Sequence, residues 1–204
     1  MTEQEKIEIF ANYLPYKVQM AVFDEQYKDG YIVKELVGLC YVNRYKPFDL
    51  SEDEQHLKGV KEIKYWFSDY GLNSTVHVVK PILRPLSDIT KPIKVDGYND
   101  SKEFVPIVEL AKIGQTFQSQ SIDNWEVTKV SKDFGYGHNQ YYVQFKDNYV
   151  FGYHEKHGFY SSSNRNKEMD INNQKELWKM LYKWHVDIHG LIEKNIAVDI
   201  NTLK

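Results

Sequence analysis

The sequence has a single cysteine and no long apolar run, which argues against an intrachain disulfide and against a membrane-spanning helix. Because Cys40 is the only cysteine in 204 residues, no disulfide can form within the chain. Cys40 lies in an apolar, strand-like run, so we expect a buried and unreactive thiol. No apolar stretch approaches the roughly 20 residues that a membrane-spanning helix needs. The start of the chain is polar and acidic, unlike a secretory signal, and we therefore expect a cytoplasmic protein.

Charge of one sign is not concentrated anywhere in the sequence. The chain has 26 Lys and Arg against 29 Asp and Glu, interleaved along its length, with a formal net charge of −3. A non-specific nucleic-acid binder needs clustered positive charge, so the sequence carries no strong nucleic-acid signal. The phosphate-binding loop, the dinucleotide fingerprint and the nucleophile elbow are also absent. We therefore expect no cofactor, and no enzyme class is indicated.

Aromatic residues are in surplus, at 15% of the chain with 16 Tyr. Such a surplus fills strands and interfaces, because Tyr and Trp bury a large area and keep a polar group. Thr2 and Glu5 match a capping box and predict a helix over residues 3–13, which Pro15 ends. Four strand-like segments joined by short links then predict an antiparallel meander: 17–23, 31–41, 60–67 and 75–79. In the segment 60–67, the side chains of Ile63, Tyr65 and Phe67 are expected on one face.

Residues 80–91, here called the strap, break this pattern. Pro81 and Pro85 remove two backbone donors, which argues against a central strand. We expect the strap to cross the domain and to bury Ile82, Leu83 and Leu86. Beyond it, Pro106 and Gly114 mark the two ends of a short helix.

The second half predicts an aromatic meander followed by a long helix. Its expected strands are 125–130, 140–146, 149–154 and 158–161, and 162–170 is expected to be a polar loop. Asn172 or Asn173 caps the last helix, whose apolar face continues to about Lys194, and Asn195 suits a left-handed cap.

The predicted fold class is therefore α+β, with antiparallel meanders packed by a short N-terminal helix and a long C-terminal amphipathic helix. We expect a single domain, 1–204, which can divide into two lobes at a polar stretch rich in Gln and Ser. The two lobes would be 1–114 and 115–204.

The hairpin near residue 147 carries the main candidate contact surface. If Asp147 and Asn148 form a two-residue turn, Lys146 pairs with Tyr149 and the pairing continues outward. Aromatic rings beside Lys and Gln suit a contact with a protein or the stacking of unpaired bases. The alternatives are that a sheet or helix covers this face, or that a one-residue shift of register reverses the faces. The face consists of Tyr142, Gln144, Lys146, Tyr149, Phe151 and Tyr153.

Histidines form two candidate metal clusters. In the same register His138 lies opposite His157, and His154 lies on the adjoining turn. His185 and His189 are four apart on the predicted last helix. Nothing fixes a fourth ligand in the first cluster, and solvated or half-buried histidines explain both clusters as well. We therefore predict no metal site and keep these residues as candidates only.

Asp49, Glu62 and Lys64 resemble the pattern of metal-dependent nucleases, in which carboxylates hold Mg²⁺ and a lysine steadies the attacking water. Alternating charge on an exposed strand explains the same residues. Arg84 is either a structural anchor for a carboxylate or an exposed contact residue, and we favour the anchor.

Three segments of the sequence, here called phrases, are specific enough to compare with known protein families. They are Tyr-Leu-Pro-Tyr at 13–16, the strap followed by Phe-Val-Pro at 104–106, and the ending at 184–203. In these phrases the chain resembles an uncharacterised family of short proteins carried by phages and prophages of Bacteroidetes-type bacteria. The resemblance does not cover the segments near 40–80 and 115–170. It implies a small accessory protein and transfers no catalytic residue.

We therefore expect a non-enzymatic protein that binds a host protein or ribonucleoprotein complex. A bacterial defence complex inhibited by occlusion, in the manner of an anti-CRISPR protein, fits that expectation. The hairpin face and Arg84 are the predicted contacts. Two alternatives stay open, a metal-dependent nuclease or hydrolase using Asp49, Glu62 and Lys64, and a single-stranded nucleic-acid binder. The latter would stack bases on Tyr142, Phe151 and Tyr153.

Overall fold

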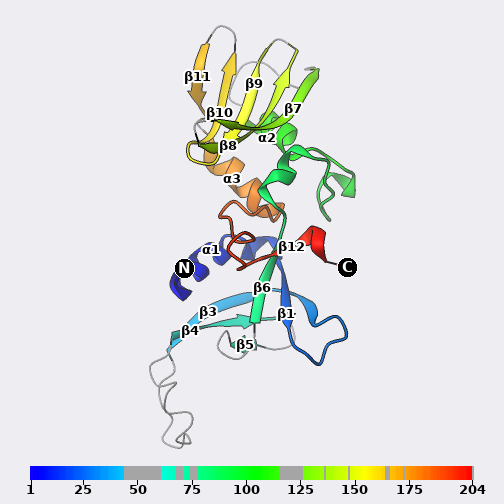
Figure 1. The fold of residues 1–204 in the computed structure, drawn as a ribbon, viewed down its shortest axis with the longest axis vertical. Coiled ribbons are helices and arrows are strands. Elements are labelled where there is room, and N and C mark those ends of the chain that lie inside the picture. The colour runs from blue at the N-terminus through cyan, green and yellow to red at the C-terminus, as the bar shows by residue number, and fades with distance from the viewer. Residues whose placement is uncertain are drawn as a thin grey trace, which may run out of the picture. The chain divides into compact units, whose positions relative to one another are not determined.

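The computed structural model describes residues 1–43, 61–67, 71–73, 78–114, 126–135, 137–146, 148–163, 166–171 and 173–203. The chain has the predicted mixed α+β content, with several antiparallel sheets (Figure 1). It divides into two compact units, unit 1 (1–84 and 187–204) and unit 2 (85–186). The polar stretch at which the sequence suggested a boundary lies outside the described residues. No helix among those residues is long and apolar enough to cross a membrane.

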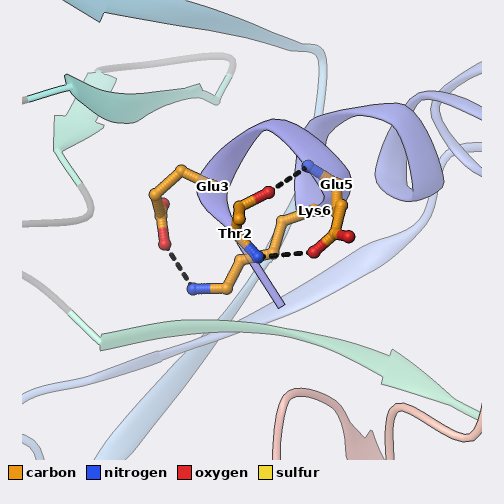
Figure 2. A network of polar contacts seen from close by, with 4 residues as sticks. All are labelled: Thr2, Glu3, Glu5 and Lys6. Carbon is orange, nitrogen blue, oxygen red and sulfur yellow. Dashed lines mark hydrogen bonds and ion pairs between the residues drawn. The ribbon is translucent and has the colours of Figure 1, made fainter.

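Unit 1 begins with helix α1 (Glu3–Ala11). Its capping box is present, as the spacing of Thr2 and Glu5 predicts. The N–H of Glu5 donates to the Thr2 hydroxyl at 3.2 Å, and the N–H of Thr2 donates to the Glu5 carboxylate at 2.6 Å (Figure 2). Lys6 forms an ion pair with Glu3 beside the cap. The short turn η1 (Leu14–Tyr16) follows the helix.

The first sheet of unit 1 has the strand order β12-β6-β1-β2. Its strands are β1 (Gln19–Phe23), β2 (Tyr31–Glu35), β6 (Val78–Leu83) and β12 (Val198–Asp199). Strand β6 pairs with β1 on one side and with β12 on the other, so it is an interior strand. The strap begins within β6, and the prediction that it could not form a central strand was therefore wrong. The sheet tolerates Pro81 because β12 pairs only with Ile82 and Leu83, beyond the proline. Ile82 and Leu83 are buried as predicted, whereas Leu86 is only half-buried.

Unit 1 also contains a three-stranded antiparallel sheet. This sheet consists of β3 (Gly38–Asn43), β4 (Lys61–Trp66) and β5 (Gly71–Asn73). Ile63, Tyr65 and Phe67 are buried, which confirms the predicted face. Cys40 is exposed, contrary to the prediction. It lies opposite Lys64, on the face that points away from Ile63, so its apolar neighbours in sequence do not cover it.

The last part of unit 1 is a series of tight turns around Asp187. Its buried carboxylate accepts hydrogen bonds from the N–H groups of Leu191 at 2.8 Å and Ile192 at 2.7 Å. Asn195 has the predicted left-handed backbone, with φ 58°, and its side chain accepts a bond from Lys80 at 2.7 Å. The turn η6 (Ile200–Thr202) follows β12.

Unit 2 is built on a five-stranded antiparallel meander with the order β11-β10-β9-β8-β7 (Figure 1). The aromatic meander predicted from the sequence is therefore present. Its last strand forms where a polar loop was predicted, and there Asp170 pairs with Tyr160. The strands are β7 (Val127–Gly135), β8 (His138–Phe145), β9 (Val150–His154), β10 (Gly158–Ser163) and β11 (Asn166–Asp170).

Two helices pack against this sheet. Helix α2 (Pro106–Gly114) begins at Pro106 as predicted and includes Gly114, which was expected just beyond its end. It contacts β8 and β9 and lies beside the short turn η3 (Leu86–Thr90). Helix α3 (Gln174–Lys183) contacts α2 and β10. Directly after α3, the fully buried Trp184 packs on Tyr98 and Phe104, with ring centroids 5.3 and 5.1 Å apart.

Helix α3 ends eleven residues before the predicted end at Lys194, because His185 adopts a left-handed backbone with φ 55°. The N–H of Val186 donates to the carbonyl of Leu181 at 2.9 Å, and the N–H of His185 donates to that of Tyr182 at 3.0 Å. These two bonds form a Schellman motif, closed by the buried Val186 and Leu181. His185 and His189 therefore do not share a helical face, and that candidate pair was wrong.

Candidate functional site

The β8–β9 hairpin pairs one residue away from the predicted register. Tyr142 lies opposite Gly152 rather than the residue after it. The N–H of Phe145 donates to the carbonyl of Tyr149 at 2.8 Å, so three residues rather than two form the loop. Asn148 is left-handed with φ 55°, as the last residue of a three-residue hairpin loop usually is. The predicted two-residue turn was therefore wrong, and the shift divides the predicted face between the two sides of the sheet.

Three of the six predicted contact residues point inward, toward the helices. Tyr149 is 8% exposed, Phe151 0% and Tyr153 2%. Helix α2 approaches so closely that a Cβ at Gly114 would lie 2.7 Å from the Phe151 ring. Trp178 of α3 meets Tyr153 edge to face at 5.3 Å. Burial raises the pKa of both Tyr149 and Tyr153. These three side chains belong to the core, so neither a partner protein nor an unpaired base can stack on them in this fold.

Tyr142 and Gln144 lie on the opposite, outward face of the sheet, where they are half-buried. The strand pairing places Gly152 between Tyr142 on β8 and Tyr160 on β10. A Cβ at Gly152 would lie 2.4 Å from Cζ of Tyr160, so the Tyr160 ring crosses the glycine backbone in the direction of β8. We call Tyr142, Gly152 and Tyr160 the tyrosine row.

Polar side chains surround the tyrosine row. Lys129 Nζ donates to the Tyr142 hydroxyl at 2.6 Å and lies 5.1 Å from the centre of its ring. This hydrogen bond raises the pKa of Lys129, which is fully exposed. The side-chain amide of Gln144 donates to Asn148 at 3.1 Å. The outward face thus has an aromatic centre and a rim of groups that form hydrogen bonds.

The charges near this face largely cancel. Asp133 lies four residues after Lys129 and therefore on the same face of β7, and its negative charge helps to raise the pKa of Lys129. Lys146, another predicted contact residue, is exposed and forms a 2.8 Å ion pair with Glu126. No excess of positive charge therefore accompanies the tyrosines among these residues.

The three candidate histidines of unit 2 do come together. The ring of His154 lies 5.5 Å from that of His138 and 4.7 Å from that of His157. His154 is 5% exposed, and its Nδ1 accepts the backbone N–H groups of Lys156 at 3.0 Å and His157 at 3.3 Å. Among the residues that the structure describes, no three His, Cys, Asp or Glu side chains are arranged to hold a metal ion.

The remaining candidates lie in unit 1. Arg84 directly follows β6, and its backbone carbonyl accepts a hydrogen bond from the backbone N–H of Asp187. The Arg84 side chain is half-buried. Lys64 Nζ lies 4.4 Å from the centre of the Trp66 ring. Asp49 and the side chain of Glu62 lie outside the described residues, so the nuclease constellation remains a prediction.

Sequence reasoning missed Tyr160, Gly152 and Lys129 as parts of the site. A glycine inside a strand signals a close approach by another group, and Gly152 in the middle of β9 is such a signal. Tyr160 could not be placed over it without the β9–β10 register, which depends on the turn at Gly158.

Comparison of the chain with models of known protein families, with curated proteins and with solved structures gives no match.

Proposed function

We propose that this protein is a binding factor whose outward sheet face, centred on the tyrosine row, contacts a partner protein. The observation that carries the proposal is the position of Tyr142 and Tyr160 across Gly152, outside the core and on the face opposite α2 and α3. Tyrosine is enriched among the residues that supply most of the free energy of protein binding, because it buries a large area and keeps a hydroxyl group.

The surroundings of the row favour a protein over other partners. A typical protein interface has an aromatic centre and a polar rim, and Gln144 and Lys129 lie where such a rim would be. A surface for single-stranded nucleic acid would need excess positive charge as well as rings. Here Lys129 has Asp133 beside it, and Lys146 is paired with Glu126.

The resemblance of the strap and the ending to phage and prophage proteins extends this proposal to a class of partner. On that basis the partner is a host complex inside the cell, such as a defence complex. The protein would inhibit it by covering a surface that the complex needs for its activity. A sheet face with outward-pointing aromatic and polar side chains suits occlusion, because a binding factor of this kind requires shape complementarity and no reactive group.

The experiment is affinity capture from nuclease-treated lysate of a Bacteroidetes-type host, with captured proteins identified by mass spectrometry. The baits are the wild-type chain, Tyr142→Ala with Tyr160→Ala, and a matched control, Lys132→Ala. Lys132 is exposed on β7 and lies opposite Tyr141, on the inward side of the sheet. We expect one stoichiometric partner with the wild type and the control. The double variant should bind it about thirtyfold more weakly, which corresponds to the loss of about 2 kcal/mol.

Equal capture of the same partner by all three folded baits would overturn the assignment of the face. Absence of any stoichiometric protein partner from the wild-type eluate would overturn the proposal itself. Tight, strongly salt-dependent binding of the wild type to a labelled single-stranded oligonucleotide, lost in the double variant, would instead favour the nucleic-acid alternative.

A further inference from the structure

Strand β7 (Val127–Gly135) is an edge of the five-stranded sheet and its longest strand. Among the described elements it pairs with β8 alone and also packs near η3, which contacts β8 as well. An edge strand presents a row of backbone N–H and C=O groups that another strand can pair with. Two of its apolar side chains are exposed, Val127 at 41% and Phe134 at 73%.

The sequence of β7 is complementary to itself when it runs antiparallel. Ser131 is the midpoint of the strand, so a two-fold axis at Ser131 pairs the whole length of β7 with a second copy. In this register Lys129 of each copy lies opposite Asp133 of the other, and both residues occupy the same face of the strand. Opposite charges in directly facing positions stabilise a strand pair.

The same register covers the exposed apolar residues. It places Phe134 of each copy opposite Thr128 of the other, next to Val127. Covering a large apolar side chain that is otherwise 73% exposed is favourable because apolar surface leaves water. The two ends of the strand would then carry apolar contacts, and the two positions flanking its centre would carry ion pairs.

Two features of β7 normally protect an edge from pairing, lysines and a bulge. Here Lys129 has a partner charge in Asp133, and Lys132 lies on the inward side, 5.4 Å from the centre of the Tyr141 ring. The irregularity in the pairing falls between Val127 and Lys129, at one end of the strand. The central residues, from Lys129 to Asp133, keep a regular ladder, so these features leave the centre free to pair.

We propose that β7 pairs antiparallel with β7 of a second copy of this chain about a two-fold axis at Ser131. The pairing joins two five-stranded sheets into one continuous sheet and closes the dimer. Pairing of β7 with the other edge, β11, would leave one free β11 and one free β7, which are the two surfaces that made the contact, and would therefore produce longer assemblies. The proposal rests on the edge of the sheet and not on the tyrosine row, although Lys129 lies beside both.

The test measures the mass of the full chain by sedimentation equilibrium over a wide range of protein concentrations. In the proposed register, Lys129→Glu places an acidic residue opposite Asp133 at both facing positions. Asp133→Lys places a lysine opposite Lys129 at both of them. Each single variant should therefore dimerise at least about tenfold more weakly than the wild type. An equimolar mixture of the two variants restores both ion pairs and should form a mixed dimer with an affinity close to that of the wild type.

The matched control is Lys132→Glu, which changes the charge of the same strand by the same amount but points to the other face. Circular dichroism and thermal unfolding establish that each variant is folded. Because the mixture is compared with its own two components, a general loss of stability cannot imitate the rescue.

A wild-type chain that stays at 24.2 kDa up to several hundred micromolar would overturn the proposal. Equal weakening by the control variant, or a mixture no tighter than its components, would also overturn it. Open-ended assemblies larger than a dimer would replace it with pairing between β7 and β11.

Discussion

The backbone N–H of Asp187 donates a hydrogen bond to the carbonyl of Arg84 at 2.8 Å. Arg84 is the last residue of unit 1 before the chain enters unit 2, and Asp187 is the first residue after it returns. The two connections to unit 2 therefore lie side by side. Adjacent ends are typical of a domain inserted into another domain. The strap and the segment 184–203 near the end of the chain meet at this bond.

We predict that residues 85–186 fold without unit 1. This segment has its own sheet, two helices and a core that includes the fully buried Val143, Phe151 and Trp184. The expected result is a cooperative thermal transition by circular dichroism and dispersed amide signals by NMR. The matched control is the same segment with Phe151→Asp, which should abolish the transition because it buries an unpaired charge. A non-cooperative melt of the unaltered segment would mean that unit 2 depends on unit 1.

A second prediction concerns the buried carboxylate of Asp187. It accepts two backbone N–H groups, and an amide at this position can accept only one of them while its NH₂ group faces the other. Asp187→Asn should therefore lower the free energy of unfolding by about 1–3 kcal/mol, measured by urea denaturation. The control is Asp199→Asn, where a half-buried carboxylate accepts one N–H group from Asn201 at 2.9 Å. Equal effects of the two variants would contradict a special role for the Asp187 bonds.

Gly152 and Tyr160 should be energetically coupled. Gly152→Ala puts a Cβ 2.4 Å from the Tyr160 ring, so the ring must move or the strands must shift, at a cost of about 1–3 kcal/mol. Removing the ring with Tyr160→Ala should erase most of that cost. The check is a double-mutant cycle of unfolding free energies. The control is Gly38→Ala, whose Cβ would meet Trp66 at an ordinary 3.6 Å. Additive effects at residues 152 and 160 would disprove the close approach.

The stability of unit 1 should depend on His189 in mildly acidic solution. Burial lowers the pKa of His189 from its ordinary value of 6.5, and the charge of Asp187 only partly opposes this. The unfolded chain therefore takes up a proton near pH 6.5 that the folded chain does not. Stability is full above that pH and falls as the pH drops through 6.5 to the lower folded value.

His189→Gln should flatten this part of the stability profile, measured by urea denaturation between pH 7.5 and 5. The wild-type chain, measured in the same buffers, supplies the reference slope. An unaltered slope in His189→Gln would show that another group titrates there.

Local signals in the sequence predicted several elements well. Pro106 and Gly114 mark the two ends of α2 because proline suits the first helical turn and glycine suits the end. The alternation of Ile63, Tyr65 and Phe67 identified the buried face of β4 because side chains alternate strictly along a strand. Each of these signals depends only on residues close together in the chain.

The errors all depended on contacts between distant residues or on backbone conformations that few residue types signal. The apolar spacing continued past Lys183, but a histidine took the left-handed position that normally indicates glycine, so the end of α3 could not be seen. Pro81 could enter an interior strand because β12, more than a hundred residues later, pairs only beyond it.

The candidate site was half predicted for the same reason. The sequence identified the right hairpin and named Tyr142 and Gln144, but its assumed loop was one residue too short. That single residue exchanged the inward and outward faces for Tyr149, Phe151 and Tyr153. The buried sides of α2 and α3 decide which face lies inward, and no spacing within the hairpin contains that information.

The parallel pairing of β12 with β6 has a consequence for the order of assembly during translation. Val198 and Asp199, which pair with Ile82 and Leu83, leave the ribosome only after the whole of unit 2 has been made. Until then β6 has an uncovered edge in the nascent chain, and such edges invite misassembly. Pro81 lies within β6 and, without a backbone N–H, is a poor partner for a stray strand. Pro81 would therefore protect the growing chain until β12 is made.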